Sequence, residues 1–456
     1  MAAVPANDYV TAKDNQDLDH LPGKYGKPFI GYTFPFLMRP YDVLDGIYKT
    51  YGPISKASLT FQRMVICLGP EYIKLLTLDR DQVFSPKMGY DGPLGDFFDG
   101  GLLMRDFGEH KIHRRIMQSA FKTEAMRGYV DEMHPIIDNH LQRWSNDQNF
   151  HFYPNIKTLL LDLGSKVFLG LDMDGEETKA LNQDFLDMMA GTLSLIRKDW
   201  PGLLYRKGMN GRRGLEKFFT ELVPGRRSND GKDMASYFSK ETDEDGNLFS
   251  EKVVADHLIF LLLAAHDTTT SALTMTAYLL AHDQEWQEKI RQEALTLNSG
   301  QLSYDDLGSS VPNMQNVFHE TLRLYPPVPQ FMRRTVKDIE IDGHHIPAHS
   351  MLQCSPLYTH RMEEYWTNPH GFDPDRFAAG REEHKQHPFL WAPFGGGAHK
   401  CIGMHFADMI YKSVLSKMVT NYRWSFAKEE QYPSKIQYFP FSKPIDDLPL
   451  KMELIK

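Results

Sequence analysis

The chain has 456 residues, 41% hydrophobic and 24% charged, and 51 basic residues stand against 60 acidic ones for a formal net charge of −9. These proportions are those of a folded globular protein rather than a disordered one, and the acidic balance gives no support to nucleic-acid binding. The chain shows no repeat, low-complexity tract or linker, so we expect one domain over residues 1–456.

The N-terminal segment "MAAVPANDYVTAKDNQDLDHLPGKYGKP" has no apolar core of the kind that a signal peptide or a membrane anchor needs. We therefore expect a cytoplasmic protein whose residues 1–20 form a flexible segment. The longest apolar run, "LIFLLLAA" at 258–265, is far shorter than the ~20 residues that span a bilayer, so it predicts a buried helix segment.

Helical periodicity dominates, most clearly over 106–128, 252–283, 285–298, 313–325 and 403–421. Short β-type segments occur at 61–67, at 338–355 and at 449–455. The sequence therefore predicts a mainly α protein with small β-sheets. The segment 251–283 would be about 48 Å long as a single helix, so it would cross the whole domain.

The middle of that helix, "LLLAAHDTTTSAL", interrupts an apolar run with His266, Asp267 and three threonines. Burying these groups costs desolvation free energy and helix propensity unless they find partners. Because local rules fail there inside a core helix, this segment indicates a functional site.

Three cysteines are too few and too scattered for a disulfide framework. Cys67 and Cys354 lie in apolar segments and are expected to be small buried hydrophobes. Cys401 stands in "FGGGAHKCIG" at 394–403, where glycines let the backbone lie flat against a bulky planar partner. An apolar helix expected to start near Ile402 would favour the thiolate. A thiolate on such a platform suits a metal within a flat macrocycle.

The loop from Phe394 to Gly403 closely resembles the haem-binding loop of the cytochromes P450, the haem-thiolate monooxygenases. This resemblance implies the cytochrome P450 fold, with haem b (iron protoporphyrin IX) between the long central helix and the cysteine loop. It makes Cys401 the axial iron ligand, in a family whose thiolate favours O–O cleavage. The family usually has Arg at the position of His399, so a propionate contact is expected there. Zinc bound by His399, Cys401 and His405 is disfavoured, because structural zinc needs four ligands.

Further motifs follow in the order of this family. "ETLR" at 320–323 and "FDPDRF" at 372–377 resemble the segments that form a buried network of Glu320, Arg323 and Arg376, with a structural role. "AAHDTT" at 264–269 resembles the oxygen-activation motif. Ala264 and Thr268, four residues apart, share a helix face that leaves room over the iron, and Asp267 would relay protons.

The resemblance also implies groups that hold the haem propionates and line a substrate pocket. His110 and Arg114 in "GEHKIHRR", together with Arg333, correspond to propionate ligands. The pocket walls would be mostly apolar, which implies a terpenoid, steroid or fatty acyl substrate. They correspond to Tyr90, Phe97, Phe98, Leu102, Leu103, Met104, Phe260, Ala264, Val328, Phe331, Phe439 and Phe441.

The function implied is that of a monomeric monooxygenase that uses O2 and electrons from a ferredoxin or flavodoxin with its NAD(P)H reductase. That donor is expected to dock on a basic patch of Lys111, Arg115, Lys122, Lys400 and Lys412. The alternatives are a haem-thiolate isomerase, dehydratase or peroxygenase, and a non-catalytic haem sensor. The intact Asp267–Thr268 pair favours the monooxygenase. Sterol demethylases resembling this chain usually carry His where Asp267 stands, which disfavours demethylation.

Overall fold

The computed structural model describes residues 7–144, 149–171, 175–297, 302–308 and 310–455. Most of them lie in helices: α1 Thr33–Met38, α2 Pro40–Tyr51, α3 Pro70–Leu78, α4 Pro86–Phe98, α5 Phe107–Gln118, α6 Thr123–Trp144, α7 Phe152–Leu169, α8 Glu176–Thr192, α9 Leu204–Arg227, α10 Met234–Lys240, α11 Glu251–His282, α12 Gln284–Leu295, α13 Pro312–Leu324, α14 Pro356–Thr359 and α15 Met404–Asn421. The strands are short: β1 Ile54–Leu59, β2 Gln62–Cys67, β3 Phe84–Ser85, β4 Phe331–Thr335, β5 Ile339–Ile341, β6 His344–Ile346, β7 Met351–Cys354, β8 Tyr422–Phe426, β9 Ile436–Gln437, β10 Lys443–Pro444 and β11 Leu450–Leu454.

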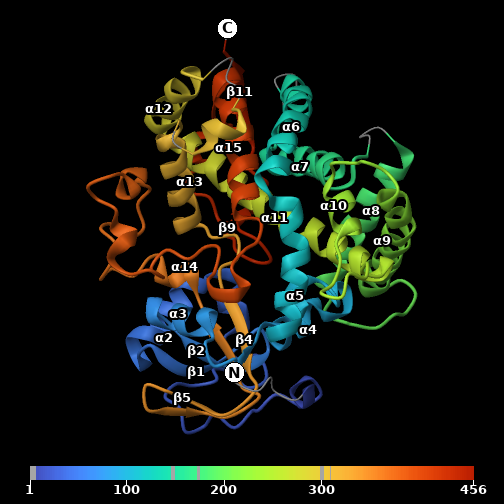
Figure 1. Cartoon of the computed structure of the whole chain (residues 1–456). Coiled ribbons are helices and arrows are strands. Elements are labelled where there is room, and N and C mark those ends of the chain that lie inside the picture. The colour runs from blue at the N-terminus through green and yellow to red at the C-terminus, as the bar shows by residue number, and fades with distance from the viewer. Residues whose placement is uncertain (1–6, 145–148, 172–174, 298–301, 309, 456) are drawn as a thin grey trace.

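The long helix α11 runs through the middle of the molecule (Figure 1). It packs against α7 and α9 on one side and against α13 and α15 on the other. By length and composition it could cross a membrane, but 78% of its apolar window is buried inside the protein. It is therefore the core helix around which the others are arranged, and its surroundings decide which of its side chains are reachable.

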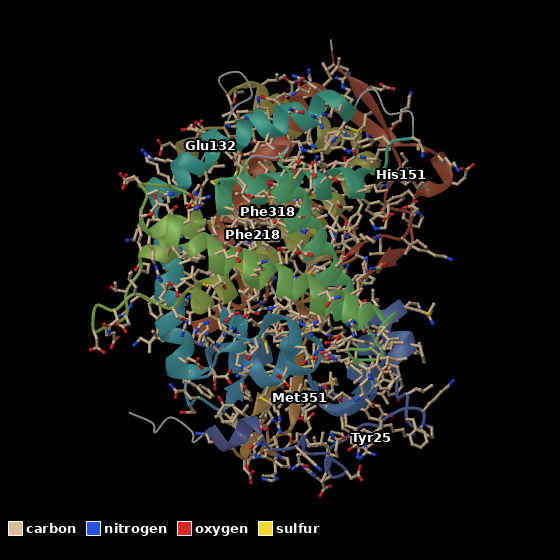
Figure 2. The ribbon with its side chains drawn as sticks, turned by 90° about the vertical axis from the view of Figure 1, so that its right-hand side faces the viewer. Tyr25, Glu132, His151, Phe218, Phe318 and Met351 are labelled. Carbon is tan, nitrogen blue, oxygen red and sulfur yellow. The ribbon has the colours of Figure 1, made fainter. Side chains whose placement is uncertain are left out.

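The main sheet has five strands in the order β1-β2-β7-β4-β3. Strands β2 and β7 are parallel, with Cys67 opposite Cys354, and the other pairs are antiparallel. This sheet lies at the lower end of the molecule in Figure 1. In the turned view of Figure 2, Tyr25 marks that end, whereas Glu132 and His151 lie at the opposite, helical end.

The mainly α class with small sheets is confirmed, and most predicted elements begin and end within a few residues of the predicted bounds. Asp283 explains one boundary: it follows α11, and its side chain accepts a hydrogen bond from Trp286 N at 3.0 Å, which caps α12. Residue 298, the predicted end of α12, lies outside the described residues.

One continuous helix over 106–128 is wrong, because the structure breaks it between α5 and α6. Ser119 Oγ donates a hydrogen bond back to Ile116 O at 2.8 Å, residues 119–121 form a 3-10 turn, and Lys122 has an extended backbone. A serine hydroxyl that competes for a backbone carbonyl favours such a break. The two helices can therefore point in different directions.

The N-terminal residues 7–20, for which we expect flexibility, lie against the rest of the protein. Tyr9 Oη donates to Asp106 Oδ2 at 2.9 Å, Arg334 Nη1 donates to Tyr9 O at 3.1 Å, and Leu18 is fully buried. Buried hydrogen bonds of this kind order a terminal segment. Residues 1–6 of the predicted flexible segment lie outside the described residues.

Candidate active site

The cysteine loop packs tightly against the end of α3. A Cβ added to Gly397, whose φ is +61°, would lie 2.0 Å from the Thr77 carbonyl oxygen. The loop is closed by a hydrogen bond from Cys401 N to Phe394 O of 2.9 Å. Gly397 is therefore required by packing against α3 as well as by its left-handed backbone, a reason that differs from the flat platform predicted from the sequence. Gly403, by contrast, has only Phe121 near its position for a Cβ, at 3.9 Å.

Cys401 has accessible surface, unlike Cys67 and Cys354, but neighbouring protein atoms desolvate its thiol. Burial raises the pKa of the Cys401 thiol, and the Gly403 N–H and the charges of Arg114 and Lys400 only partly oppose this shift. The helix α15 begins at Met404, later than predicted. The Gly403 N–H just before α15 acts toward the thiolate, as the sequence predicts, but it does not outweigh the effect of burial. A bound cation is what would deprotonate this thiol.

Four basic side chains that the sequence assigns to haem propionates meet on the cysteine side. The rings of His110 and His399 stack with centroids 3.6 Å apart. Burial lowers the pKa of His110 to about 4, and the charges of Arg114 and Arg333 add to this shift. Burial, His110 and the charges of Arg333 and Arg114 hold the pKa of His399 well below its usual range.

Within the described residues, none of these four side chains forms an ion pair with a carboxylate. Arg333 instead donates to the Met332 and Leu76 carbonyls, at 2.8 and 3.3 Å. The guanidinium charges of Arg114 and Arg333, placed without a counter-ion, cost free energy that an anionic group would recover. The cluster therefore fits the two propionates of haem, and the exposed Cys401 beside Arg114 fits the iron.

The middle of α11 presents one accessible face. Ala264 is exposed, although Leu261, Leu262 and Leu263 just before it are all buried. Thr268 lies one turn further and is half-buried, and its Oγ1 donates to Ala264 O at 2.7 Å. A methyl group and a hydroxyl thus share an open face in the centre of the protein.

Asp267 does not share that face. It is 4% exposed, and its Oδ1 lies 3.2 Å from Lys157 Nζ of α7 and 3.2 Å from His266 Nδ1. Burial acts to raise the pKa of this carboxyl, but His266 and Lys157 outweigh it, so the pKa of Asp267 is lowered. Lys157 was missed in the sequence, because nothing in "NIKTLLL" links it to α11.

Glu320, Arg323 and Arg376 come together with their side chains completely buried. Arg323 donates to both Glu320 oxygens, at 2.6 and 2.8 Å, and Arg376 Nε donates to Glu320 Oε1 at 3.1 Å. The backbone N–H of Asp373 also donates to Glu320 Oε1, at 2.9 Å. The network ties α13 to the segment that precedes the cysteine loop.

The predicted pocket walls divide into two groups. Half-buried side chains that retain accessible surface are Tyr90, Leu103, Phe260, Val328, Phe439 and Phe441. Side chains that are at most 8% exposed are Phe97, Phe98, Leu102, Met104 and Phe331.

Phe97 shows the physical reason for the second group. It packs beneath the crossing of α8 and α9, where a Cβ on Gly191 would lie 2.6 Å from Gly208 Cα and 3.0 Å from the Phe97 ring. Two glycines bring the helices so close that the ring is enclosed. Phe97 thus packs in the core, and its ring has no accessible surface in this structure.

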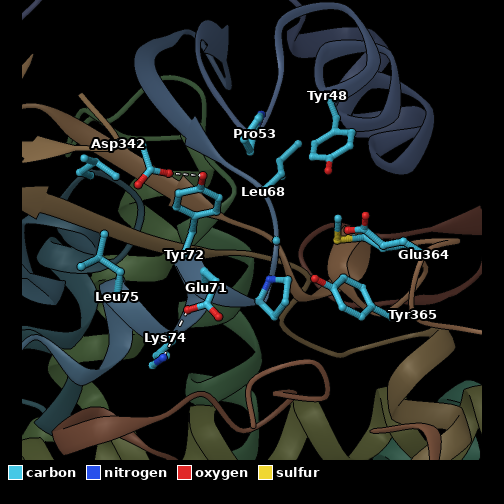
Figure 3. Close-up of a pocket in the computed structure, with 14 residues that line it drawn as sticks. Tyr48, Pro53, Leu68, Glu71, Tyr72, Lys74, Leu75, Asp342, Glu364 and Tyr365 are labelled. Carbon is cyan, nitrogen blue, oxygen red and sulfur yellow. Dashed lines mark hydrogen bonds and ion pairs between the residues drawn. The ribbon is translucent and has the colours of Figure 1, made fainter. Parts of the chain in front are cut away.

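A cleft lies elsewhere, between α2, α3 and the β5–β6 hairpin (Figure 3). It has a volume of about 520 Å³ and is lined by Tyr48, Tyr72, Asp342 and Tyr365 among others. Tyr72 Oη donates to Asp342 Oδ2 at 2.6 Å. None of the residues assigned to catalysis or haem lines this cleft, so its size does not make it the active site.

Residues 21–451 match the family model for cytochrome P450. This chain is a cytochrome P450. The cytochrome P450 136 of Mycobacterium tuberculosis is 35% identical over 432 residues, 94% of this chain and 87% of that protein. The taxane 10-beta-hydroxylase of Taxus cuspidata is 29% identical, over 88% of this chain and 83% of that protein.

The fold agrees with that of a solved cytochrome P450. The retinoic acid-bound cyanobacterial CYP120A1 superposes with a TM-score of 0.85 at 24% identity, and the match covers 95% of this chain and 99% of that one. Membership in the family makes the protein a haem enzyme of the monooxygenase class, which uses O2 and a redox partner. The zinc site considered for His399, Cys401 and His405 gains no support, since the described residues contain no group of three or more His, Cys, Asp or Glu side chains placed to hold a metal ion.

Proposed function

We propose that this cytochrome P450 inserts one oxygen atom from O2 into a hydrophobic, terpenoid-type small molecule, with haem b as its cofactor and in the cytoplasm. The observation that carries this proposal is the open face of α11, where Ala264 and Thr268 are accessible although the residues just before them are buried. A hydroxyl and an ionised Asp267 next to it can supply protons where oxygen is reduced.

Haem bound here would supply the iron at which O2 is activated. Cys401 would hold that iron, and His110, Arg114, Arg333 and His399 would hold the propionates. Ala264 keeps space open because it carries only a methyl group. Thr268 Oγ1 lies on the same accessible face and donates to Ala264 O at 2.7 Å. Asp267 forms an ion pair with Lys157 and can hold a proton next to Thr268 in the sequence of the helix.

Replacement Thr268→Ala is expected to leave haem content, substrate binding and O2 consumption in place. Because the hydroxyl that delivers protons is lost, reducing equivalents should leave as hydrogen peroxide, and product per reducing equivalent should fall by roughly tenfold or more. Asp267→Asn should slow turnover more than it misdirects it, since the hydroxyl remains. The measurement is product and peroxide formed per NAD(P)H consumed.

Thr274→Ala is the matched control for this experiment. Thr274 lies on the same helix and makes the same bond to the carbonyl four residues earlier, at 2.7 Å, but is fully buried. It should retain wild-type coupling. Unchanged coupling in Thr268→Ala would contradict the proposed proton delivery. Turnover that needs no reducing equivalents would favour an isomerase, dehydratase or peroxygenase, and haem binding without turnover would favour a sensor.

The terpenoid-type substrate is supported by apolar and aromatic side chains that retain accessible surface, such as Phe260 on α11 and Val328. The similarity to the taxane hydroxylase points the same way, because a taxane is a polycyclic terpenoid. Purified holoprotein should therefore give a substrate-type change in its absorption spectrum with terpenoids at lower concentrations than with steroids or fatty acids. Tighter binding of fatty acids would overturn the substrate class.

A ferredoxin- or flavodoxin-type donor is supported by exposed basic residues on and near α5 and the cysteine loop: Lys111, Arg115, Lys122 and Lys400. The inclusion of Lys412 in this patch is wrong, because Lys412 is 1% exposed and its Nζ donates to Leu307 O at 2.5 Å. Reduction by an acidic carrier should slow as salt rises, since the Debye length falls to about 3 Å at 1 M. If the rate of haem reduction changes neither with salt concentration nor in the Lys400→Glu variant, this result would count against such a donor.

A further inference from the structure

His266 lies in the core beside the acid of the oxygen-activation motif. It is 4% exposed. Its Nε2 lies 3.1 Å from Lys157 O, and its Nδ1 lies 3.2 Å from Asp267 Oδ1. The Phe185 ring of α8 stands edge-on to its ring at 5.5 Å, and the small cavity beside it is otherwise lined by apolar residues and Gly164.

Both groups that face the imidazole nitrogens are acceptors. A peptide carbonyl can only accept, so Nε2 carries a hydrogen. A neutral imidazole then has only a lone pair on Nδ1, and that lone pair would face a carboxylate oxygen. The contact is favourable only when a proton lies between Nδ1 and Oδ1. Lys157 Nζ also lies 3.2 Å from the same Asp267 oxygen, and its positive charge favours the carboxylate form of Asp267, which leaves the proton on the histidine.

The contact is close but loosely aligned. Neither His266 Nδ1 nor Asp267 Oδ1 makes a well-aligned hydrogen bond in the described structure, although both are completely buried. Buried polar atoms in this condition are costly and keep unused bonding capacity. The proton between them is therefore not fixed by a well-aligned hydrogen bond, so it can move from Nδ1 to Oδ1.

Lys157 connects this pair to the surface. Its Nζ lies 3.2 Å from the same Asp267 oxygen, and 23% of its side chain is exposed. The other ionisable groups around it are Tyr153, whose ring Lys157 and Lys443 both approach, and Asp447, which pairs with Lys443. The buried cluster of His266, Asp267 and Lys157 thus carries one excess positive charge, which release of one proton would remove.

We propose that His266 is a positioning residue that stores, as an imidazolium, a proton for Asp267. This inference rests on the proposed function, in which Asp267 and Thr268 deliver protons. In the step, the Nδ1–H bond of His266 breaks and an O–H bond forms on Asp267 Oδ1. The imidazole stays neutral with its Nε2–H on Lys157 O. Solvent at Lys157 returns the proton, so no oxidant or reductant is needed.

The direct test measures the protonation of the two ring nitrogens of His266. Protein labelled with ¹⁵N-histidine is examined by NMR as its reduced carbon monoxide complex, which is diamagnetic. The signal that disappears in His266→Gln, or in His266→Asn if the first variant unfolds, belongs to His266. It should show both nitrogens protonated at neutral pH, and in Asp267→Asn it should revert to one protonated nitrogen. One bare nitrogen in the wild type would overturn the proposal, whatever the enzyme turns over.

The second test is kinetic. In His266→Gln the amide can donate to Asp267 but cannot store a proton, so kcat should fall by roughly tenfold or more while KM and the substrate-induced spectrum stay unchanged. His282→Gln is the control, because His282 is exposed at the end of the same helix and stacks on Tyr432 at 3.7 Å. Wild-type kcat in His266→Gln across the whole pH range would overturn the proposal.

Discussion

Replacement Glu320→Ala is expected to leave almost no haem-containing protein. The change removes a carboxylate that both Arg323 and Arg376 contact, and all three side chains are completely buried. Two guanidinium groups would lose this partner where water cannot reach them, at a cost of roughly 3–5 kcal/mol. Domains are stable by only about 5–15 kcal/mol. Haem content per protein and the midpoint of thermal unfolding are the measurements.

Glu288→Ala is the matched control. Glu288 also contacts two arginines, Arg291 at 3.0 Å and Arg423 at 2.9 Å, but its side chain is 38% exposed. An exposed pair contributes about 0–1 kcal/mol, so this variant should bind haem normally. Glu320→Gln keeps the hydrogen-bond acceptor without the charge and should fall between the two. If Glu320→Ala has normal haem content and stability, the network has no structural role.

The fold class follows from local patterns. The apolar run of α11 and the periodic segments of α12, α13 and α15 give helices whose bounds differ from the predicted ones by only a few residues. The break between α5 and α6 was not predicted, because apolar periodicity does not register a single hydroxyl such as Ser119. A helix pattern thus predicts that a helix exists more reliably than it predicts where the helix ends.

The site is only partly readable from the sequence. Spacing places Ala264 and Thr268 on one face, since four residues make about one helical turn. The contact of Lys157 with Asp267 joins α7 to α11 across 110 positions of the chain, and no local pattern contains it. The enclosure of Phe97 likewise depends on how α8 crosses α9 at Gly191 and Gly208. Contacts made by tertiary packing are therefore what the sequence leaves open.

Replacement Cys401→Ala is expected to abolish the red-shifted absorption band of the ferrous carbon monoxide complex completely. Cys401 is exposed in the recess beside Arg114, whereas Cys67 and Cys354 have no accessible surface. The band requires a thiolate on the iron, and alanine offers no ligand atom. His110, Arg114, Arg333 and His399 remain, so the variant should still bind some haem. Its spectrum is recorded after reduction under carbon monoxide.

Cys354→Ala is the control, because it removes a thiol from the same protein without touching the loop. Cys354 lies opposite Cys67 between β7 and β2, and burial raises its pKa to about 12, so neither thiol offers a thiolate at neutral pH. This variant should keep the full band, with a modest loss of stability from the small cavity. If the band survived in Cys401→Ala and vanished in Cys354→Ala, the iron ligand would be Cys354 on β7 rather than Cys401. Because desolvation raises the pKa of the Cys401 thiol, its ligation and its ionisation should appear together when haem is added to the apoprotein.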